Sequence, residues 1–419
     1  MKCPNCNETE HEPGAKFCHV CGCQLGVELV KDSYRTNTIS EFIAPVTIGH
    51  RWCLIDSEGR TIRELPYCEL GDNVRPFHEG FASVCHQSKT GYIDKAGNLV
   101  VPVVYNAGKD YSEHRAAVFN GNHWGYLNNL GNIIVSFEYN RVRDFSEGLA
   151  AVKKNDKWGY INDIGKTVIP FIFEDAYSFS QGLAVVQFED KYGYINKTGQ
   201  VAIPSRNVGN GLGRFLHKQI RSIFGKPILV NVSGESVTSL PFNYALPFSE
   251  GIAVVDVAEE DKQTCRFRFI NKEGDFIRFR HCDNSFGRTG DFSEGIVAVS
   301  PGKYVHRFEI RKECEDFGYI DITGKNIHGF HLNTAYPFNE GMARVGFTER
   351  GVKHTGFIDK SGTLVLDYTE DEFDVFYNFT CGLTPVGKRD GCGWKYGYIN
   401  KRGNVVIPFK YDQALPFGK

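Results

Sequence analysis

The sequence predicts an all-β protein made of tandem β-meander repeats of about 34–45 residues. Three observations support this prediction. A seven-residue motif recurs along the chain, and four of its copies follow one another at intervals of 34 residues. The 419 residues include 32 Phe, 20 Tyr and 45 Gly, a composition that favours short strands and tight turns. No long segment has the apolar spacing of an amphipathic helix.

The recurring motif is an aromatic or aliphatic run followed by Asp or Asn, two further residues and Gly. Asp or Asn opens a turn by bonding to its own backbone, and Gly takes the left-handed conformation that closes the turn. The apolar segments on both sides are expected to be strands. We identify ten copies, at residues 53–59, 91–97, 125–131, 159–165, 193–199, 228–234, 268–274, 318–324, 356–362 and 397–403.

A second landmark precedes the motif: an aromatic residue, then Ser-Glu-Gly or a variant, then a strand of small apolar residues, as in 145–152 and 292–299. One unit therefore contains a turn, a strand, a hairpin, a second strand, an Asx turn and a third strand. Because its acidic residue recurs in the same turn, we expect a structural role for it. The recurring glutamates are Glu147, Glu250, Glu294 and Glu340.

Units of this size cannot bury a core singly, so they are expected to stack side by side as a propeller or a solenoid. We assign residues 41–216 to repeats one to five and residues 217–419 to repeats six to ten. The sequence leaves open whether these form one ten-unit array or two five-unit lobes. The divergent stretch 205–226 is basic and contains no Asp or Glu.

The N-terminus carries two C-x₂-C pairs, Cys3 with Cys6 and Cys18 with Cys21. Each pair directs two thiolates at one ion, and the two pairs together complete the tetrahedron of a structural Zn²⁺ site. Four thiolates leave no open position for a catalytic water. We therefore predict one structural zinc ion in a ribbon formed by residues 1–25, followed by a linker at 26–40.

Residues 1–25 resemble the short zinc-ribbon domains of many bacterial proteins, whose pattern is CPxCG…GAKFCxxCG. Asn7 replaces the usual Gly after Cys6, which is a mild departure. In that family the ribbon is a small folding unit and often an interaction module, and it rarely specifies a reaction. The resemblance therefore implies a module for recognition.

The repeat region from about residue 41 to 419 resembles the WG-repeat family, which is named for a Trp-Gly pair. Trp124 and Trp158 each precede Gly and match the pair, whereas Tyr192, Phe317 and Tyr396 stand in place of Trp in further copies. The resemblance implies an all-β repeat fold and leaves the biochemical role undefined.

Composition limits the kinds of partner. The 48 Lys and Arg against 50 Asp and Glu give a net charge of −2, so no overall attraction to nucleic acid or to an anionic membrane is expected. No apolar run approaches the ~18 residues of a membrane span, and no signal peptide precedes Cys3. The 13 cysteines are an odd number, which favours a reducing compartment over a disulfide framework. We expect a bacterial-type cytoplasmic protein.

The sequence contains no motif that specifies catalysis. It has no G-x-S-x-G or H-E-x-x-H segment, and the Gly-x-Gly pattern at 209–213 does not join a strand to a helix. His328 and His331 are spaced three apart, a spacing that suits a metal only on a helix. We expect a non-enzymatic scaffold for protein–protein recognition. The alternatives are a glycan-directed hydrolase with a site in a propeller opening, and nucleic-acid binding through the ribbon and 205–226.

Hairpin length points to a binding region. The interval from the last Val of the first strand to the motif is constant in the first five units, as from Val152 to Gly159, but longer in later units. Examples are Val345 to Gly356 and Val386 to Gly397. Insertions in a repeat array commonly mark its binding face. We therefore expect the second half to supply the recognition surface and the first half to supply scaffold.

Overall fold

The computed structural model describes residues 41–49, 51–65, 72–203, 221–223, 226–230, 236–237, 240–256, 267–277, 288–300, 316–371, 373–374, 377–391 and 393–418. The four cysteines of the predicted zinc site therefore lie outside the described residues, as does most of the basic stretch 205–226. Within the described ranges every regular element is a strand, which confirms the all-β prediction.

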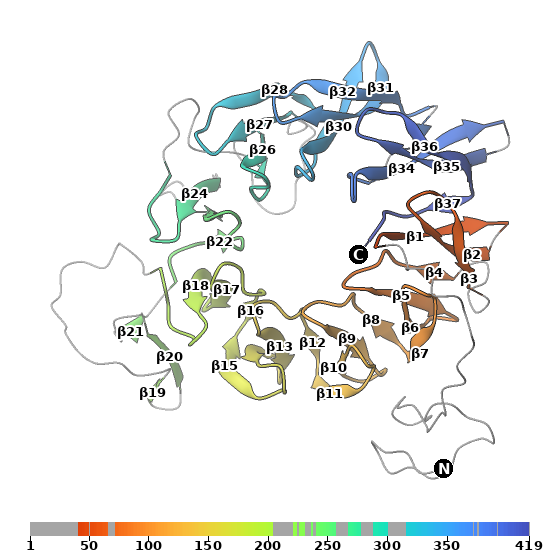
Figure 1. The fold of residues 1–419 in the computed structure, drawn as a ribbon. Coiled ribbons are helices and arrows are strands. Elements are labelled where there is room, and N and C mark those ends of the chain that lie inside the picture. Colours follow the sequence, from red (N-terminus) through yellow and green to blue (C-terminus); the bar gives the residue numbers. More distant parts are fainter. Residues whose placement is uncertain are drawn as a thin grey trace, which may run out of the picture.

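Nine small antiparallel sheets stand as blades around a ring, so the described residues form a nine-bladed β-propeller (Figure 1). Each chain segment enters its blade by a short inner strand and leaves it by an outer one. Blades 1 to 5 contain, in chain order, β1 (Ile43–Ile48), β2 (Arg51–Asp56) and β3 (Thr61–Glu64); β4 (Asn73–Val74), β5 (Phe81–His86), β6 (Lys89–Asp94) and β7 (Leu99–Tyr105); β8 (Ala107–Gly108), β9 (Arg115–Phe119), β10 (Trp124–Asn128) and β11 (Ile133–Tyr139); β12 (Arg141–Val142), β13 (Ala150–Lys154), β14 (Lys157–Ile161) and β15 (Thr167–Phe173); β16 (Asp175–Ala176), β17 (Leu183–Phe188) and β18 (Lys191–Asn196).

Blades 6 to 9 follow the same plan. They contain β22 (Tyr244–Ala245), β23 (Ile252–Asp256) and β24 (Phe267–Asn271); β25 (Arg288–Thr289), β26 (Ile296–Ser300), β27 (Phe317–Asp321) and β28 (Asn326–Leu332); β29 (Thr334–Ala335), β30 (Met342–Glu349), β31 (Val352–Asp359) and β32 (Leu364–Thr369); β33 (Phe373–Asp374), β34 (Leu383–Asp390), β35 (Gly393–Asn400) and β36 (Val405–Tyr411). The last strand, β37 (Gln413–Ala414), pairs with β1 and closes the ring.

The register within the blades agrees with the sequence. Val152 lies opposite Gly159, and Val345 lies opposite Gly356, as the constant and the lengthened intervals require. The Asx turns also form as predicted. Asn162 Oδ1 accepts from the backbone N–H of Lys166 at 2.9 Å, and Gly165 has a φ of +80°. That positive φ is readily available only to Gly.

The prediction of ten stacked units is wrong by one. The copy at 228–234 overlaps β20 (Lys226–Val230), which forms a separate sheet with β19 (Arg221–Ile223) and β21 (Ser236–Val237) outside the ring (Figure 1). This sheet belongs to a segment inserted into the outer strand of blade 5. Ile195 pairs with Val201 before the insertion, and Tyr192 pairs with Phe242 after it. The division of the repeats at residue 216 falls in this segment, outside the described residues, and stays a prediction.

The core lies between neighbouring blades. Tyr160 of β14 is fully buried, and its hydroxyl donates to the carbonyl of Tyr177 in the next blade at 2.8 Å. Its ring packs against Phe179, with ring centroids 4.9 Å apart. The hydrogen-bonded tyrosine thereby joins its blade to the next one without leaving a buried polar atom unpaired. The same bond is made by Tyr92, Tyr126, Tyr194, Tyr319 and Tyr398.

Candidate functional site

The ring has two faces that the blades build differently. The turn face carries the Ser-Glu-Gly turns and the Asx turns, since both connect strands at that end of each blade. The hairpin face, at the opposite end, carries the hairpins between the second and third strands. The inner rim is formed by the residues that follow the short inner strands.

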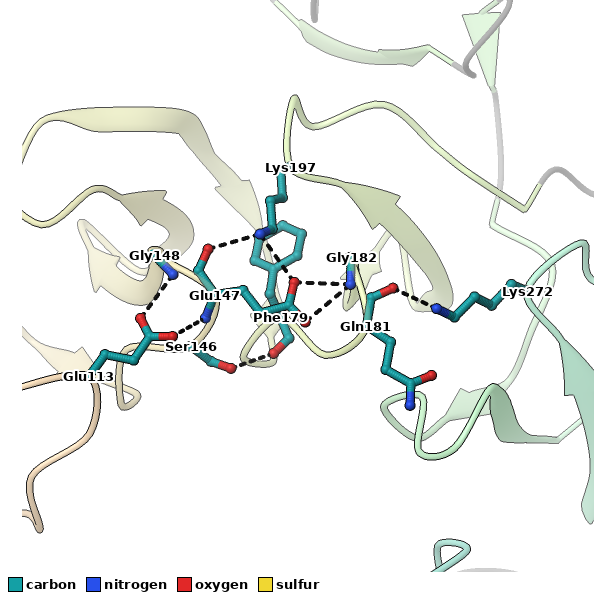
Figure 2. A network of polar contacts seen from close by, with 9 residues as sticks. All are labelled: Glu113, Ser146, Glu147, Gly148, Phe179, Gln181, Gly182, Lys197 and Lys272. Carbon is teal, nitrogen blue, oxygen red and sulfur yellow. Dashed lines mark hydrogen bonds and ion pairs between the residues drawn. The ribbon is translucent and has the colours of Figure 1, made fainter. Parts of the chain in front are cut away.

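The Ser-Glu-Gly turns are two-residue hairpin turns with both central residues left-handed. Glu147 has a φ of +55° and Gly148 of +82°, and Ser146 and Leu149 exchange both backbone hydrogen bonds. Glu is an unusual residue for this conformation. Its carboxylate offsets the cost by accepting the backbone N–H of Gly182 in the next blade at 3.0 Å (Figure 2).

This contact repeats around the ring as a relay of carboxylates. Glu113 accepts from the backbone N–H groups of Glu147 and Gly148 at 2.5 and 2.9 Å (Figure 2). Lys197, from an Asx turn, adds an ion pair to Glu147 at 3.2 Å. The relay fixes each turn to the next one, so the recurring glutamates are structural, as expected. Equivalent bonds are made by Glu79, Gln181, Glu250, Glu294 and Glu340.

The inner rim is charged in one part of the ring. Arg75 pairs with Asp110 at 3.6 Å, and Lys109 pairs with Asp144 at 3.5 Å, each bond joining one blade to the next. Arg143 continues the series, because its guanidinium lies over the ring of Tyr177 at 4.3 Å and pairs with an aspartate of blade 5. Farther round, the equivalent rim positions are apolar or aromatic, namely Leu246, Tyr336 and Leu415.

The hairpin face is uneven. The hairpins of blades 8 and 9 pair eight residues on each strand, whereas those of blades 3 and 4 pair five. Both long hairpins end in exposed charged residues. Blades 8 and 9 are neighbours in the ring, so both long hairpins belong to one sector of the hairpin face (Figure 1). The exposed charges at the tips are Glu349, Arg350, Lys353, Lys388, Arg389 and Asp390.

The described residues offer no metal site. No group of three His, Cys, Asp or Glu side chains in the described ranges is arranged to hold an ion. His328 Nδ1 lies 3.0 Å from the carbonyl of Gly362, and His331 lies 3.6 Å from Asp316, so the two histidines have separate partners. The Gly-x-Gly pattern at 209–213 lies outside the described residues. Zinc binding by the four N-terminal cysteines stays a prediction.

Sequence comparison finds one family. Its model, the WG containing repeat, matches residues 91–122, 124–158, 158–192, 192–206, 317–346 and 396–419. These matches support a WG-repeat protein. They cover the second half of blade 2, blades 3 and 4, most of blade 5, parts of blades 7 to 9, and β37. No curated protein sequence matches the chain.

Several solved structures are similar to this chain at very low sequence identity. A eukaryotic initiation factor is 8% identical, with a TM-score of 0.54 over 89% of this chain and 98% of that chain. The dihydro-heme d1 dehydrogenase NirN is 11% identical, with a TM-score of 0.41 over 80% of this chain and 74% of that one. The dipeptidyl peptidase 4 of Porphyromonas gingivalis is 9% identical, with a TM-score of 0.45 over 82% and 59%. The first of these supports the propeller fold and nothing further.

Within the described ranges, no helix has the length and apolar character that crossing a membrane requires.

Proposed function

We propose that this propeller is a non-enzymatic scaffold that binds a protein partner through the long hairpins of blades 8 and 9. One observation carries the proposal. The β30–β31 and β34–β35 hairpins pair eight residues a side, whereas the hairpins of blades 1 to 5 pair five or six. Phe347 packs against the core at the base of the first hairpin, whereas residues 348–353 and 388–390 are exposed, so most of the extra length lies outside the core.

The chemistry of the two hairpins suits recognition. Their tips expose both basic and acidic side chains, with Arg350 and Lys353 beside Glu349 on the first. Rigid strands hold these groups in place, which lowers the entropy cost of binding. Nearer the blade, His354 stacks on Phe347 with ring centroids 5.0 Å apart and lies 2.7 Å from Asp367, so the base of the hairpin is fixed.

The contacts of the turn face and the inner rim suit a structural role. The carboxylates of the turn face are engaged in bonds between blades, and the rim cations of blades 2 to 4 are paired. The cysteines Cys3, Cys6, Cys18 and Cys21 would hold one structural zinc ion in a separate ribbon, joined to blade 1 by residues 26–40. We propose that this ribbon is a second recognition module.

A hairpin exchange tests the proposal. Residues 346–355 and 387–396 are each replaced by Lys-Lys-Asn-Asp-Lys-Trp, the segment found at 153–158 of blade 4. The matched control replaces residues 187–192 of blade 5 by the same segment. Partners are captured with the wild-type chain from the native cell, and their binding is then measured with purified proteins.

The double exchange should weaken partner binding by at least about tenfold, the equivalent of one strong contact, whereas the blade 5 control should bind as wild type does. Unfolding curves establish that both variants are folded. Wild-type affinity in the double exchange would overturn the proposal.

A further inference from the structure

Asp291 is a rim carboxylate without a cationic neighbour among the described residues. It follows Gly290, whose backbone N–H donates to Ala298 at 3.1 Å. Lys109 and Arg143 make the same bond to Ala117 and Ala151. Asp291 therefore occupies in blade 7 the position that Asp110 and Asp144 occupy in blades 3 and 4.

In blades 3 and 4, the aspartate at this rim position is paired with a cation. There the preceding blade supplies Arg75 to Asp110 and Lys109 to Asp144. The residue of blade 6 that stands in the place of these cations is Leu246, which donates its backbone N–H to Val254 in the same pattern. Among the described residues, the preceding blade thus supplies no cation to this rim position, which retains its carboxylate.

Two tyrosines of the preceding blades lie close enough to Asp291 to sense its charge. Its charge acts on Tyr194 and on Tyr244, whose pKa values are raised chiefly by burial and further by this carboxylate. The Tyr194 hydroxyl donates to the carbonyl of Leu246 at 2.7 Å. Water reaches the Asp291 side chain, yet desolvation by the neighbouring blades raises the pKa of its carboxyl.

We propose that Asp291, with Tyr244 and Leu246, receives the side chain of an arginine or lysine from the protein partner. The inference rests on the proposed recognition function and names a contact within it. A guanidinium or ammonium group would pair with the carboxylate as the internal cations do in blades 2 to 4. Its alkyl stem would lie on Leu246, and the aromatic ring would face the charge.

The test uses the full chain and two small probes. N-acetyl-arginine methylamide is titrated while the Asp291 carboxyl is followed by NMR, and the neutral citrulline analogue serves as the matched probe. Asp291→Asn removes the charge, and Leu246→Lys restores an internal cation like Lys109. Asp144→Asn is the control, since Asp144 already has a partner.

The arginine probe should shift the Asp291 resonance, and citrulline should bind about tenfold more weakly or worse, as expected for loss of a charged hydrogen bond. Asp291→Asn and Leu246→Lys should each cause a similar loss, whereas Asp144→Asn should not. Without a probe, the carboxyl of Asp291 should titrate above its ordinary pKa of 3.8. A midpoint below 3.8 would reveal an internal cation and overturn the proposal.

Equal binding of the arginine probe by wild type and Asp291→Asn would also overturn it, and this variant decides the matter if Leu246→Lys does not fold. Failure of the rim-site proposal can be distinguished from failure of the proposed function, which the hairpin exchange tests. A chain that loses its partner on hairpin exchange, but keeps it as Asp291→Asn, retains the proposed function and refutes the rim site.

Discussion

The backbone of Val46 pairs antiparallel with that of Ala414, so β37 completes the blade that the first described strand begins. We call this β1–β37 pairing the clasp, and further contacts stabilise it on both sides of β37. Tyr398 donates its hydroxyl to Leu415 at 2.8 Å and packs on Phe417, with ring centroids 4.9 Å apart. Closure removes the free strand edges that an open array of sheets would present between its first and last blades.

Phe417→Ala should therefore destabilise the propeller by about 3–5 kcal/mol, since it empties a buried aromatic site at the clasp. Phe417 is only 2% exposed. Gln413→Ala is the control, because Gln413 lies on β37 itself but has an exposed side chain. Denaturant titration measures both variants, and equal midpoints would show that the clasp does not hold the ring.

Glu147→Asn should cost roughly 1–3 kcal/mol, because the shorter side chain cannot reach the N–H of Gly182. Asn accepts the left-handed conformation, so the backbone contribution is small. Asp156→Asn is the matched control. Asp156 also has a positive φ, of 62°, but its side chain is 99% exposed. If the two variants unfold at the same denaturant concentration, the carboxylate relay contributes nothing to stability.

Gly165→Val should be more damaging than Lys166→Val, by about 1–3 kcal/mol. Gly165 has a φ of +80°, and a Cβ there would lie 3.3 Å from Val135 of the preceding blade. Lys166 is exposed in the same turn. Unfolding free energies from denaturant titration decide the matter, and similar values for the two variants would refute the turn assignment.

The turns and the register were open to prediction because they depend on local chemistry. Asn162 and Gly165 define their turn within one motif, and the interval from Val152 to Gly159 fixes the hairpin register. The partner of the recurring glutamate was hidden, because the Gly182 N–H that Glu147 reaches belongs to another blade. Repetition reveals that a residue has a role, but not which neighbour it contacts.

The number of blades was predicted too high for a similar reason. Residues 228–234 carry an Asn, two residues and Gly, so they satisfy the local rule for an Asx turn. They lack the preceding Ser-Glu-Gly turn that links blades. Blade membership depends on that link between units, and the described residues of the segment, 228–230, lie instead in the small sheet outside the ring. The aspartate at rim position 291 was equally hidden, because its meaning depends on Leu246 of another unit.

Glu294→Gln should reveal an acid-dependent contribution to stability. Partial burial opposes ionisation, but Lys360 at 3.0 Å and the N–H of Gly341 at 2.9 Å lower the pKa of Glu294 below its ordinary 4.5. The unfolded chain then binds more protons than the folded one. The stabilisation is therefore complete above pH 4.5 and lost as the pH falls through the folded-state pKa.

The variant should accordingly be less stable than wild type at pH 7 by about 1 kcal/mol, and the difference should shrink on acidification. Unfolding titrations at pH 7 and at pH values below 4.5 measure it. A difference that stays constant over this range would contradict the assigned ion pair.

The purified chain should contain about one zinc ion by elemental analysis, as the four-cysteine spacing requires. Replacing Cys3, Cys6, Cys18 and Cys21 together by Ser should remove it. Chelation should leave the β-type circular dichroism largely intact, because the propeller has its own core. Full zinc retention in the quadruple variant would refute the site, and global unfolding on chelation would refute the independence of the two parts.

The recognition claim is tested most directly by photo-cross-linking in the native cell. A photoreactive amino acid is placed at Arg350, at Arg389 or at Asp156, which are all exposed tips of hairpins on the same face. The positions in blades 8 and 9 should give adducts with the same protein partner, and Asp156 in blade 4 should give none. If neither long hairpin yields an adduct, or if Asp156 captures the partner equally well, these hairpins are not the recognition surface.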